Sequence, residues 1–314
     1  MSTGTTADDA SLAQLQNAPI DIVLNSLDQV PATLPSYREL YYRWERQQWQ
    51  TQEIDLVPDR IQWEDLAEEE QEGYLVGASA FFQGEASVTK ALGTYILAAP
   101  NEEVRIFLTT QQVDEARHTI LFDRFFCEVF GIDHGSIPES LAFTRQYINK
   151  PMQDILIYEL EEISERLRRD PYKRETLVEA VSLYHIIVEG TLALAGERSL
   201  LEEYRREQLF PGFRGGLTAV VRDESRHVIF GVKFLRDMLT EHEAYRRIIE
   251  QTLMRLAPVA LEALTPSQEM CAWKLSTKED PWITPRYGRE SLRKKLKVMG
   301  LQFELPSVPP PPSF

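Results

Sequence analysis

The stretch VDEARHTI, residues 113–120, returns almost unchanged as RDESRHVI, residues 222–229, so the pattern Asp-Glu-x-Arg-His occurs twice in one chain. Residues three apart share one face of a helix, so each copy can present a carboxylate and an imidazole to the same point. A single Glu-x-x-His pair commonly belongs to a solvated helix face. Two matched copies instead predict a pair of helices that share one task.

Two further acids stand alone in apolar stretches. Glu85 lies in GASAFFQGEASVTKAL, and Glu189 lies in AVSLYHIIVEGTLALAG. An ionised glutamate on such a face is costly to bury unless it is paired or bound to a metal. The alternative for each is an interior salt bridge, with Lys90 as the partner of Glu85.

Together these segments give two helices with one buried glutamate each and two helices with Glu-x-x-His. This is the donor set of ferritin-like bundles that hold two metal ions between carboxylates. Four carboxylates and two neutral imidazoles balance two divalent cations, and mixed oxygen and nitrogen donors suit iron or manganese. The predicted metal ligands are Glu85, Glu115, His118, Glu189, Glu224 and His227.

An aspartate precedes the glutamate in both copies of the repeat. Histidine ligands of metals usually donate their second ring N–H to a carboxylate or carbonyl, which fixes the ring. We therefore expect Asp223 to orient His118 and Asp114 to orient His227, crosswise through the bundle. The alternative is a surface ion pair of each aspartate with Arg117 or Arg226.

The chain of 314 residues has long helical patterns and few alternating ones, which predicts an all-α bundle. We expect a flexible arm over 1–35, the metal-binding bundle over 36–265, and a C-terminal extension over 266–314 that ends in the proline-rich LPSVPPPPSF. The expected helices cover residues 64–98, 101–130, 137–169 with a bend near Pro151, 172–208, 213–239, 241–262 and 289–299.

The formal charge of -15 disfavours non-specific binding of nucleic acid or of an anionic membrane. The two cysteines, Cys127 and Cys271, have no metal-like spacing, so neither a disulfide framework nor a thiolate zinc site is indicated. The N-terminus shows no signal peptide, and ionisable residues interrupt the charge-poor stretches 73–99 and 181–196. These features predict a cytoplasmic protein without a membrane span.

Over residues 36–265 the chain resembles the ribonucleotide reductase small-subunit superfamily, which has the same order of ligands. WQTQEIDL, which contains Trp49, is similar to that family's entry segment, where the tryptophan belongs to an electron-transfer route; the alternative is a packing aromatic. The family's radical tyrosine, four residues after the first ligand histidine, is replaced by Phe122. The tail has no acid and no tyrosine, so ribonucleotide reduction is disfavoured.

The chain is more similar to the ligand-binding oxidase branch of this superfamily. That resemblance implies one manganese and one iron ion, O2 activation, a long-chain fatty acid at the metals, a homodimer, and an ether cross-link between Tyr184 and Val88. It assigns manganese to the side of Glu85, with Glu115 bridging, and iron to the side of Glu189. As core residues, Tyr184 and Val88 would have no such role.

Three alternatives stay open at this point. A tyrosine-free manganese/iron reductase subunit also has phenylalanine at the radical position. A ferritin-like storage protein would bind many iron atoms per chain without an organic reaction. The same ligands also accept two irons.

Overall fold

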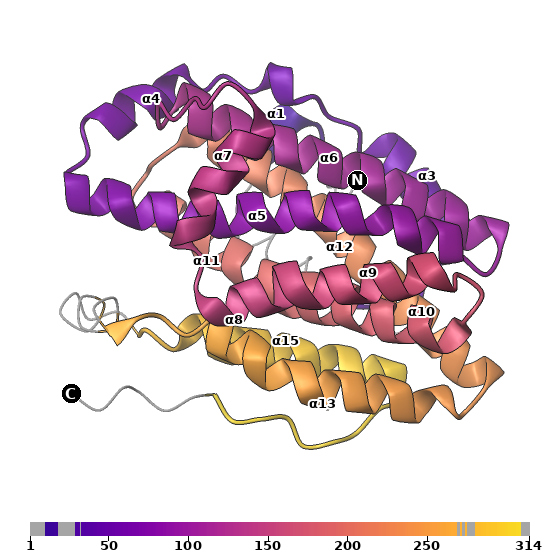
Figure 1. Ribbon diagram of the computed structural model, residues 1–314. Helices are drawn as coiled ribbons and strands as arrows, with labels where there is room; N and C mark the ends of the chain where they lie inside the picture. The colour runs from indigo at the N-terminus through magenta and orange to yellow at the C-terminus, as the bar shows by residue number, and fades with distance from the viewer. Residues whose placement is uncertain are drawn as a thin grey trace, which may run out of the picture.

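Long helices that run side by side build the protein, as the computed structural model shows (Figure 1). The structure describes residues 10–17, 29–31, 33–268, 271, 274 and 280–308, and no β-strand occurs within them. The proline-rich end of the tail, residues 309–314, lies outside this part of the chain. The all-α bundle predicted from the sequence is confirmed.

The elements follow one another along the chain with short connections. They are α1 (Leu12–Asn17), α3 (Tyr37–Arg46), η2 (Thr51–Glu53), α4 (Val57–Glu64), α5 (Glu68–Ala98), α6 (Glu102–Glu128), α7 (Ile137–Thr144), η3 (Arg145–Tyr147), α8 (Lys150–Gln153), η4 (Asp154–Glu159), α9 (Leu160–Arg169), α10 (Arg174–Val181), η5 (Ser182–Ala193), α11 (Leu194–Arg206), α12 (Pro211–Glu241), α13 (Tyr245–Ala263) and α15 (Ile283–Met299).

Helices α5 and α6 pack along each other, and α12 packs against η5 (Figure 1). Asn101 begins α6 by accepting the backbone N–H of Val104 at 3.0 Å, which satisfies one of the free donors at a helix start. Asp59 does the same for α12 from a distant segment, accepting N–H bonds from Gly212 at 2.9 Å and Phe213 at 2.7 Å. A Cβ on Gly212 would lie 2.1 Å from the carbonyl oxygen of Asp55, so only glycine permits this approach.

The expectation of one helix over 137–169 is wrong. The chain leaves the helical path at Ile148, and a new helix begins when the side chain of Asn149 accepts the N–H of Met152 at 2.9 Å. Pro151 lies in the first turn of this helix, where its missing N–H costs nothing, so it starts a helix instead of bending one. The expected helix over 64–98 is likewise divided, into α4 and α5.

Two segments have π-helical hydrogen bonding, η4 and the longer η5. In η5 the side chain of Thr191 donates to the carbonyl of Ile186, five residues earlier, at 2.8 Å. Such segments change which side chains share a helix face and are frequent at functional sites. Helix α15, from the predicted C-terminal extension, packs on η5.

The continuous helix Arg174–Arg206 is long and apolar enough to cross a membrane, judged only by length and composition. Its most apolar window is 89% buried inside the protein, as expected for a core helix of a bundle. Helix α1 lies within the predicted flexible arm and packs against α12, with Leu12 and Leu15 buried. The proposed domain boundaries stay predictions.

Candidate metal centre

Four helical segments bring the six predicted ligands together in the interior. Glu85 comes from α5, Glu115 and His118 from α6, Glu189 from η5, and the second Glu-x-x-His pair from α12. All six side chains are buried. Because the two Glu-x-x-His motifs lie within long helices, their side chains are held by packing along the whole length of the bundle.

The donor atoms form two groups, and within each group they lie within 4.8 Å of one another. Both groups contain Glu115 and Glu224, so two carboxylates, and not Glu115 alone, stand between the two positions. The first group is Glu85, Glu115, His118 and Glu224; the second is Glu115, Glu189, Glu224 and His227.

Each histidine turns its Nδ1 atom toward carboxylates. His118 Nδ1 lies 3.3 Å from Glu85 Oε2 and 3.3 Å from Glu224 Oε1. His227 Nδ1 lies 3.2 Å from Glu115 Oε1 and 3.5 Å from Glu224 Oε1. An octahedral ion with bonds of about 2.1 Å separates neighbouring donors by about 3 Å, so these spacings fit a small cation between the donors.

Several of these donors make no hydrogen bond within the described part of the chain, although they are buried. They include both Nδ1 atoms, Glu189 Oε2 and Glu224 Oε2. Buried polar atoms are normally paired, and a set of unpaired donors that converge on one place suits a metal ion. Two divalent cations would supply the missing partners and the missing positive charge.

The cluster is electrostatically strained without cations. Burial raises the pKa of Glu85, and burial and then Glu224 raise the pKa of Glu189. Burial alone would lower the pKa of His118, but Glu85 and then Asp223 outweigh it and raise that pKa. Protons thus take the place that cations would occupy among these groups.

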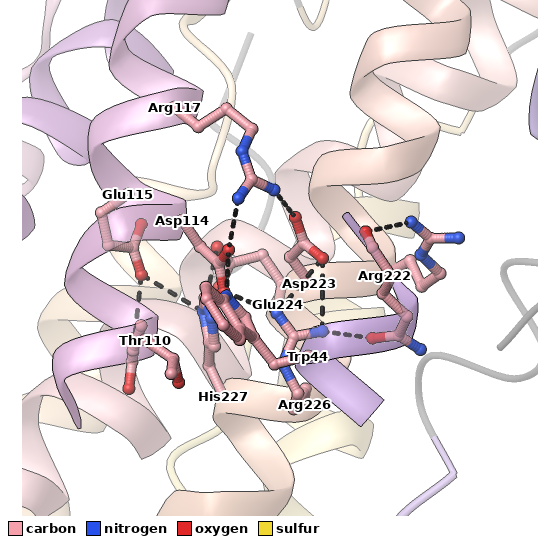
Figure 2. A network of polar contacts seen from close by, with 12 residues as sticks. Trp44, Thr110, Asp114, Glu115, Arg117, Arg222, Asp223, Glu224, Arg226 and His227 are labelled. Carbon is pink, nitrogen blue, oxygen red and sulfur yellow. Dashed lines mark hydrogen bonds and ion pairs between the residues drawn. The ribbon is translucent and has the colours of Figure 1, made fainter. Parts of the chain in front are cut away.

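Each histidine points its second nitrogen at the aspartate of the other repeat (Figure 2). His118 Nε2 lies 3.4 Å from Asp223 Oδ2, and His227 Nε2 lies 3.2 Å from Asp114 Oδ2. This is the crossed arrangement expected from the sequence. It holds each ring with Nδ1 toward the centre.

The two arginines of the repeat join the aspartates to each other (Figure 2). Arg226 contacts Asp114 at 2.5 Å and Asp223 at 3.2 Å, and Arg117 contacts the same two residues at 3.2 Å and 3.5 Å. The ion pairs considered from the sequence therefore exist, but they are not at the surface, because Arg226 is 2% exposed and Arg117 is 11% exposed in its side chain. Burial, opposed by Arg226, leaves the pKa of Asp223 well below its ordinary value.

The sequence of residues 27–265 matches the family described as ribonucleotide reductase, small chain. The chain belongs to this family. Similar solved structures include an R2-like ligand-binding oxidase variant with an anaerobically reconstituted Mn/Fe cofactor, 26% identical, with a TM-score of 0.74. A second such variant is 25% identical with a TM-score of 0.73, and a third, with an Mn/Mn cofactor, is 26% identical with a TM-score of 0.73. Each match covers 83% of this chain and 92% of the oxidase.

In this small-chain protein, Phe122 occupies the position expected to carry a radical tyrosine. It is fully buried and stacks on Phe81 with ring centroids 5.8 Å apart. Lys90 pairs with Glu161 at 3.3 Å near the surface, so the alternative of a Glu85–Lys90 salt bridge in the interior is wrong. Trp49 donates to Asp223 at 2.8 Å and so contacts the network around His118.

Tyr184 lies directly beside the cluster. Its hydroxyl donates to Glu115 Oε1 at 2.7 Å and accepts from Gln111 at 2.9 Å. Burial and then Glu115 raise the pKa of Tyr184, so its phenol is protonated. Val88 is buried in the same hydrophobic core as Tyr184.

Sequence reasoning missed four residues around the centre. Gln111 donates to Glu189 at 2.6 Å, and its oxygen lies 3.1 Å from His185 Nε2. Burial lowers the pKa of His185 to about 3, so that ring is neutral. Glu197 is buried, with neither oxygen hydrogen-bonded to a described residue. Trp44 donates to Asp114 at 3.0 Å.

A cavity of about 880 Å³ reaches the cluster. Glu85, Glu189 and Glu224 lie in its wall together with Val88, and apolar side chains such as Leu192 line its body. The mouth near α5 and α11 is bordered by charged residues. A predominantly apolar pocket with a few polar groups at one place is the usual form of a small-molecule site.

Proposed function

We propose that the protein is an oxidase that holds one manganese and one iron ion and activates O2 for a two-electron oxidation of a C–H bond. The observation that carries this proposal is the pair of overlapping donor groups, buried and sharing Glu115 and Glu224. Membership of the small-chain family and similarity to oxidases with an Mn/Fe cofactor support it. Two irons are the alternative cofactor.

The side chains of this protein would hold and shield the metals. Glu85, Glu115, His118 and Glu224 would hold one ion, by resemblance manganese. Glu115, Glu189, Glu224 and His227 would hold the other, by resemblance iron. When bound, the two reduced ions supply electrons to O2 and so provide the oxidant. The shared carboxylates keep the ions together, while the buried Asp–Arg network fixes the histidine rings.

We further propose that the cavity binds a long-chain fatty acid or a similar apolar ligand. Its body offers apolar contact over a volume of about 880 Å³, and its inner wall contains metal-ligand carboxylates. A ligand carboxylate would gain from metal charge at that inner end. An alkyl chain would contact Leu156, Val188 and Leu192, all of which line the cavity.

Tyr184 and Val88 are the proposed partners of an ether cross-link. The Tyr184 O–H bond and the Val88 Cβ–H bond break, and a C–O bond forms, which releases two electrons and two protons. O2 takes these together with one electron from each metal ion and two protons from solvent, and becomes two waters. The Tyr184 hydroxyl already contacts Glu115 at 2.7 Å, and Val88 lines the cavity, which supports this assignment.

The test loads the protein with both metals without oxygen and then admits air, with Tyr184→Phe as control. We expect one manganese and one iron per chain, and a peptide pair joining Tyr184 to Val88 that is lighter by two hydrogens. The control should bind both metals and show no linked peptide. Two metals without a link would contradict the cross-link, and protein that binds neither metal would contradict the proposed centre.

A second candidate is a tyrosine-free reductase small subunit with a manganese/iron site. Phe122 at the radical position and the contact between Trp49 and Asp223 favour it. Ribonucleotide turnover on adding a reductase large subunit would support this candidate, and its absence together with the cross-link would support the oxidase. A homodimer and a cytoplasmic location are further proposals from the family resemblance.

A further inference from the structure

Trp44 connects the candidate metal centre to the protein surface. Its indole N–H donates to Asp114 at 3.0 Å, and Asp114 lies 3.2 Å from the outer nitrogen of His227 (Figure 2). On the other side, the Trp44 ring lies 5.8 Å from Tyr41, and Tyr41 lies 6.2 Å from Tyr42, between centroids. Tyr42 is 47% exposed. An unbroken series of contacts therefore runs from solvent to a proposed metal ligand.

Trp49 makes the corresponding contacts on the other half of the centre but differs in two ways. It donates to Asp223, which faces His118, yet its ring is only 5% exposed and lies within a hydrophobic cluster. The guanidinium of Arg117 also lies over this ring, 5.2 Å from its centroid. A cation over an indole opposes removal of an electron from that ring.

The Trp44 ring is not in that situation. Among the described residues, no lysine or arginine lies over the Trp44 ring as Arg117 lies over Trp49. Trp44 and both tyrosines belong to the same short helix, α3, which packs on α6 beside the motif of Asp114. A single rigid element therefore sets the spacing of all three rings relative to the centre.

We propose that electrons enter the metal centre through Trp44, from a one-electron reductant that meets the protein at the Tyr41–Tyr42 end of α3. This inference rests on the proposed function, because the metal pair is the acceptor. After O2 has oxidised each ion from the divalent to the trivalent state, two electrons are needed to restore it. Each transfer oxidises one donor by one electron and reduces one ion by one unit, while no bond in Trp44 is made or broken.

The test measures how fast the oxidised metal pair is reduced, not turnover of a substrate. Protein loaded with manganese and iron and oxidised in air is mixed anaerobically with reduced methyl viologen, and the absorption of the oxidised pair is followed. The variants are Trp44→Phe and Tyr41→Leu, with Trp49→Phe as the matched control on the other half. Metal content is measured for each variant before mixing.

We expect Trp44→Phe and Tyr41→Leu to slow reduction by about tenfold or more, equivalent to a barrier about 1.4 kcal/mol higher. Trp49→Phe should leave the rate unchanged. Tyr41→Leu is decisive, because it removes a ring from the route without removing the hydrogen bond to Asp114. If Tyr41→Leu reduces at the wild-type rate, or if only Trp49→Phe is slow, the inference is overturned. Protein that binds no metal pair would instead overturn the proposed function together with it.

Discussion

Replacing Asp114 with asparagine should weaken one of the two proposed metal positions and spare the other. Asp114 faces the outer nitrogen of His227 at 3.2 Å, and its oxygens are also held by Arg226 at 2.5 Å and by Trp44 at 3.0 Å. Asparagine keeps the shape of the side chain but loses its charge. The imidazole then loses the anionic partner that fixes its orientation and strengthens its Nδ1 atom as a donor.

The expected loss is about 10- to 100-fold in metal affinity, or about 1.4–2.8 kcal/mol, as found when outer partners of metal ligands are changed. It should fall on the position that contains His227. Asp223→Asn is the matched variant, since Asp223 faces His118, and it should weaken the opposite position by a similar factor. Part of the charge balance survives in each variant, because Arg117 and Arg226 keep one of their two aspartates.

The assay titrates metal-free protein with manganese and with iron under anaerobic conditions and counts bound ions per chain. Unfolding of the metal-free variants by urea separates lost affinity from lost folding. An equal loss at both positions in Asp114→Asn, or no loss in either variant at wild-type stability, would refute the reasoning that each aspartate serves the histidine of the other repeat.

Three further changes test the surrounding structure, each by urea unfolding of metal-free protein. Burial raises the pKa of Asp59 from 3.8 to about 6, more than its bonds from Gly212 and Phe213 lower it. The folded state therefore binds more protons between these values, and wild type should lose up to about 3 kcal/mol relative to Asp59→Asn as the pH rises through that window; a constant difference would contradict this. Glu197→Leu should stabilise by about 1–3 kcal/mol, because it removes a buried carboxyl without partners among the described residues, and a loss of stability would argue for an unseen partner. Phe122→Tyr should destabilise by about 1–3 kcal/mol, since its hydroxyl enters an aromatic core, unless it finds an acceptor there.

The predicted parts of the centre depended on local periodicity. Glu115 and His118 are three residues apart in a helix, so their common face follows from the sequence once the helix is assigned. Glu85 was recognisable because an acid in an apolar stretch needs a partner. Helix ends were less accurate where capping decided them: Asn149 and Pro151 together start a helix, which a periodic pattern over 137–169 conceals.

The missed residues depended on contacts between distant segments. Gln111 and His185 meet 74 positions apart, and neither has an unusual neighbourhood in the sequence. Trp44 stood in an aromatic run that could equally well be packing, and only the fold places it on Asp114. The π-helical segment around Glu189 depends on backbone bonding five residues back, which residue types alone do not specify.

The repeated motif assigns a separate task to each of its conserved-looking positions, which explains why the chain contains it twice. The glutamate of each copy, Glu115 or Glu224, belongs to both donor groups. Each aspartate faces the histidine of the other copy, and both arginines bridge both aspartates. One copy could not complete any of these contacts, because each needs a partner from the second helix. Two antiparallel or parallel helices with the same motif can complete them all only when the motifs lie at the same level of the bundle, so the repeat specifies the alignment of α6 and α12 as well as the chemistry between them.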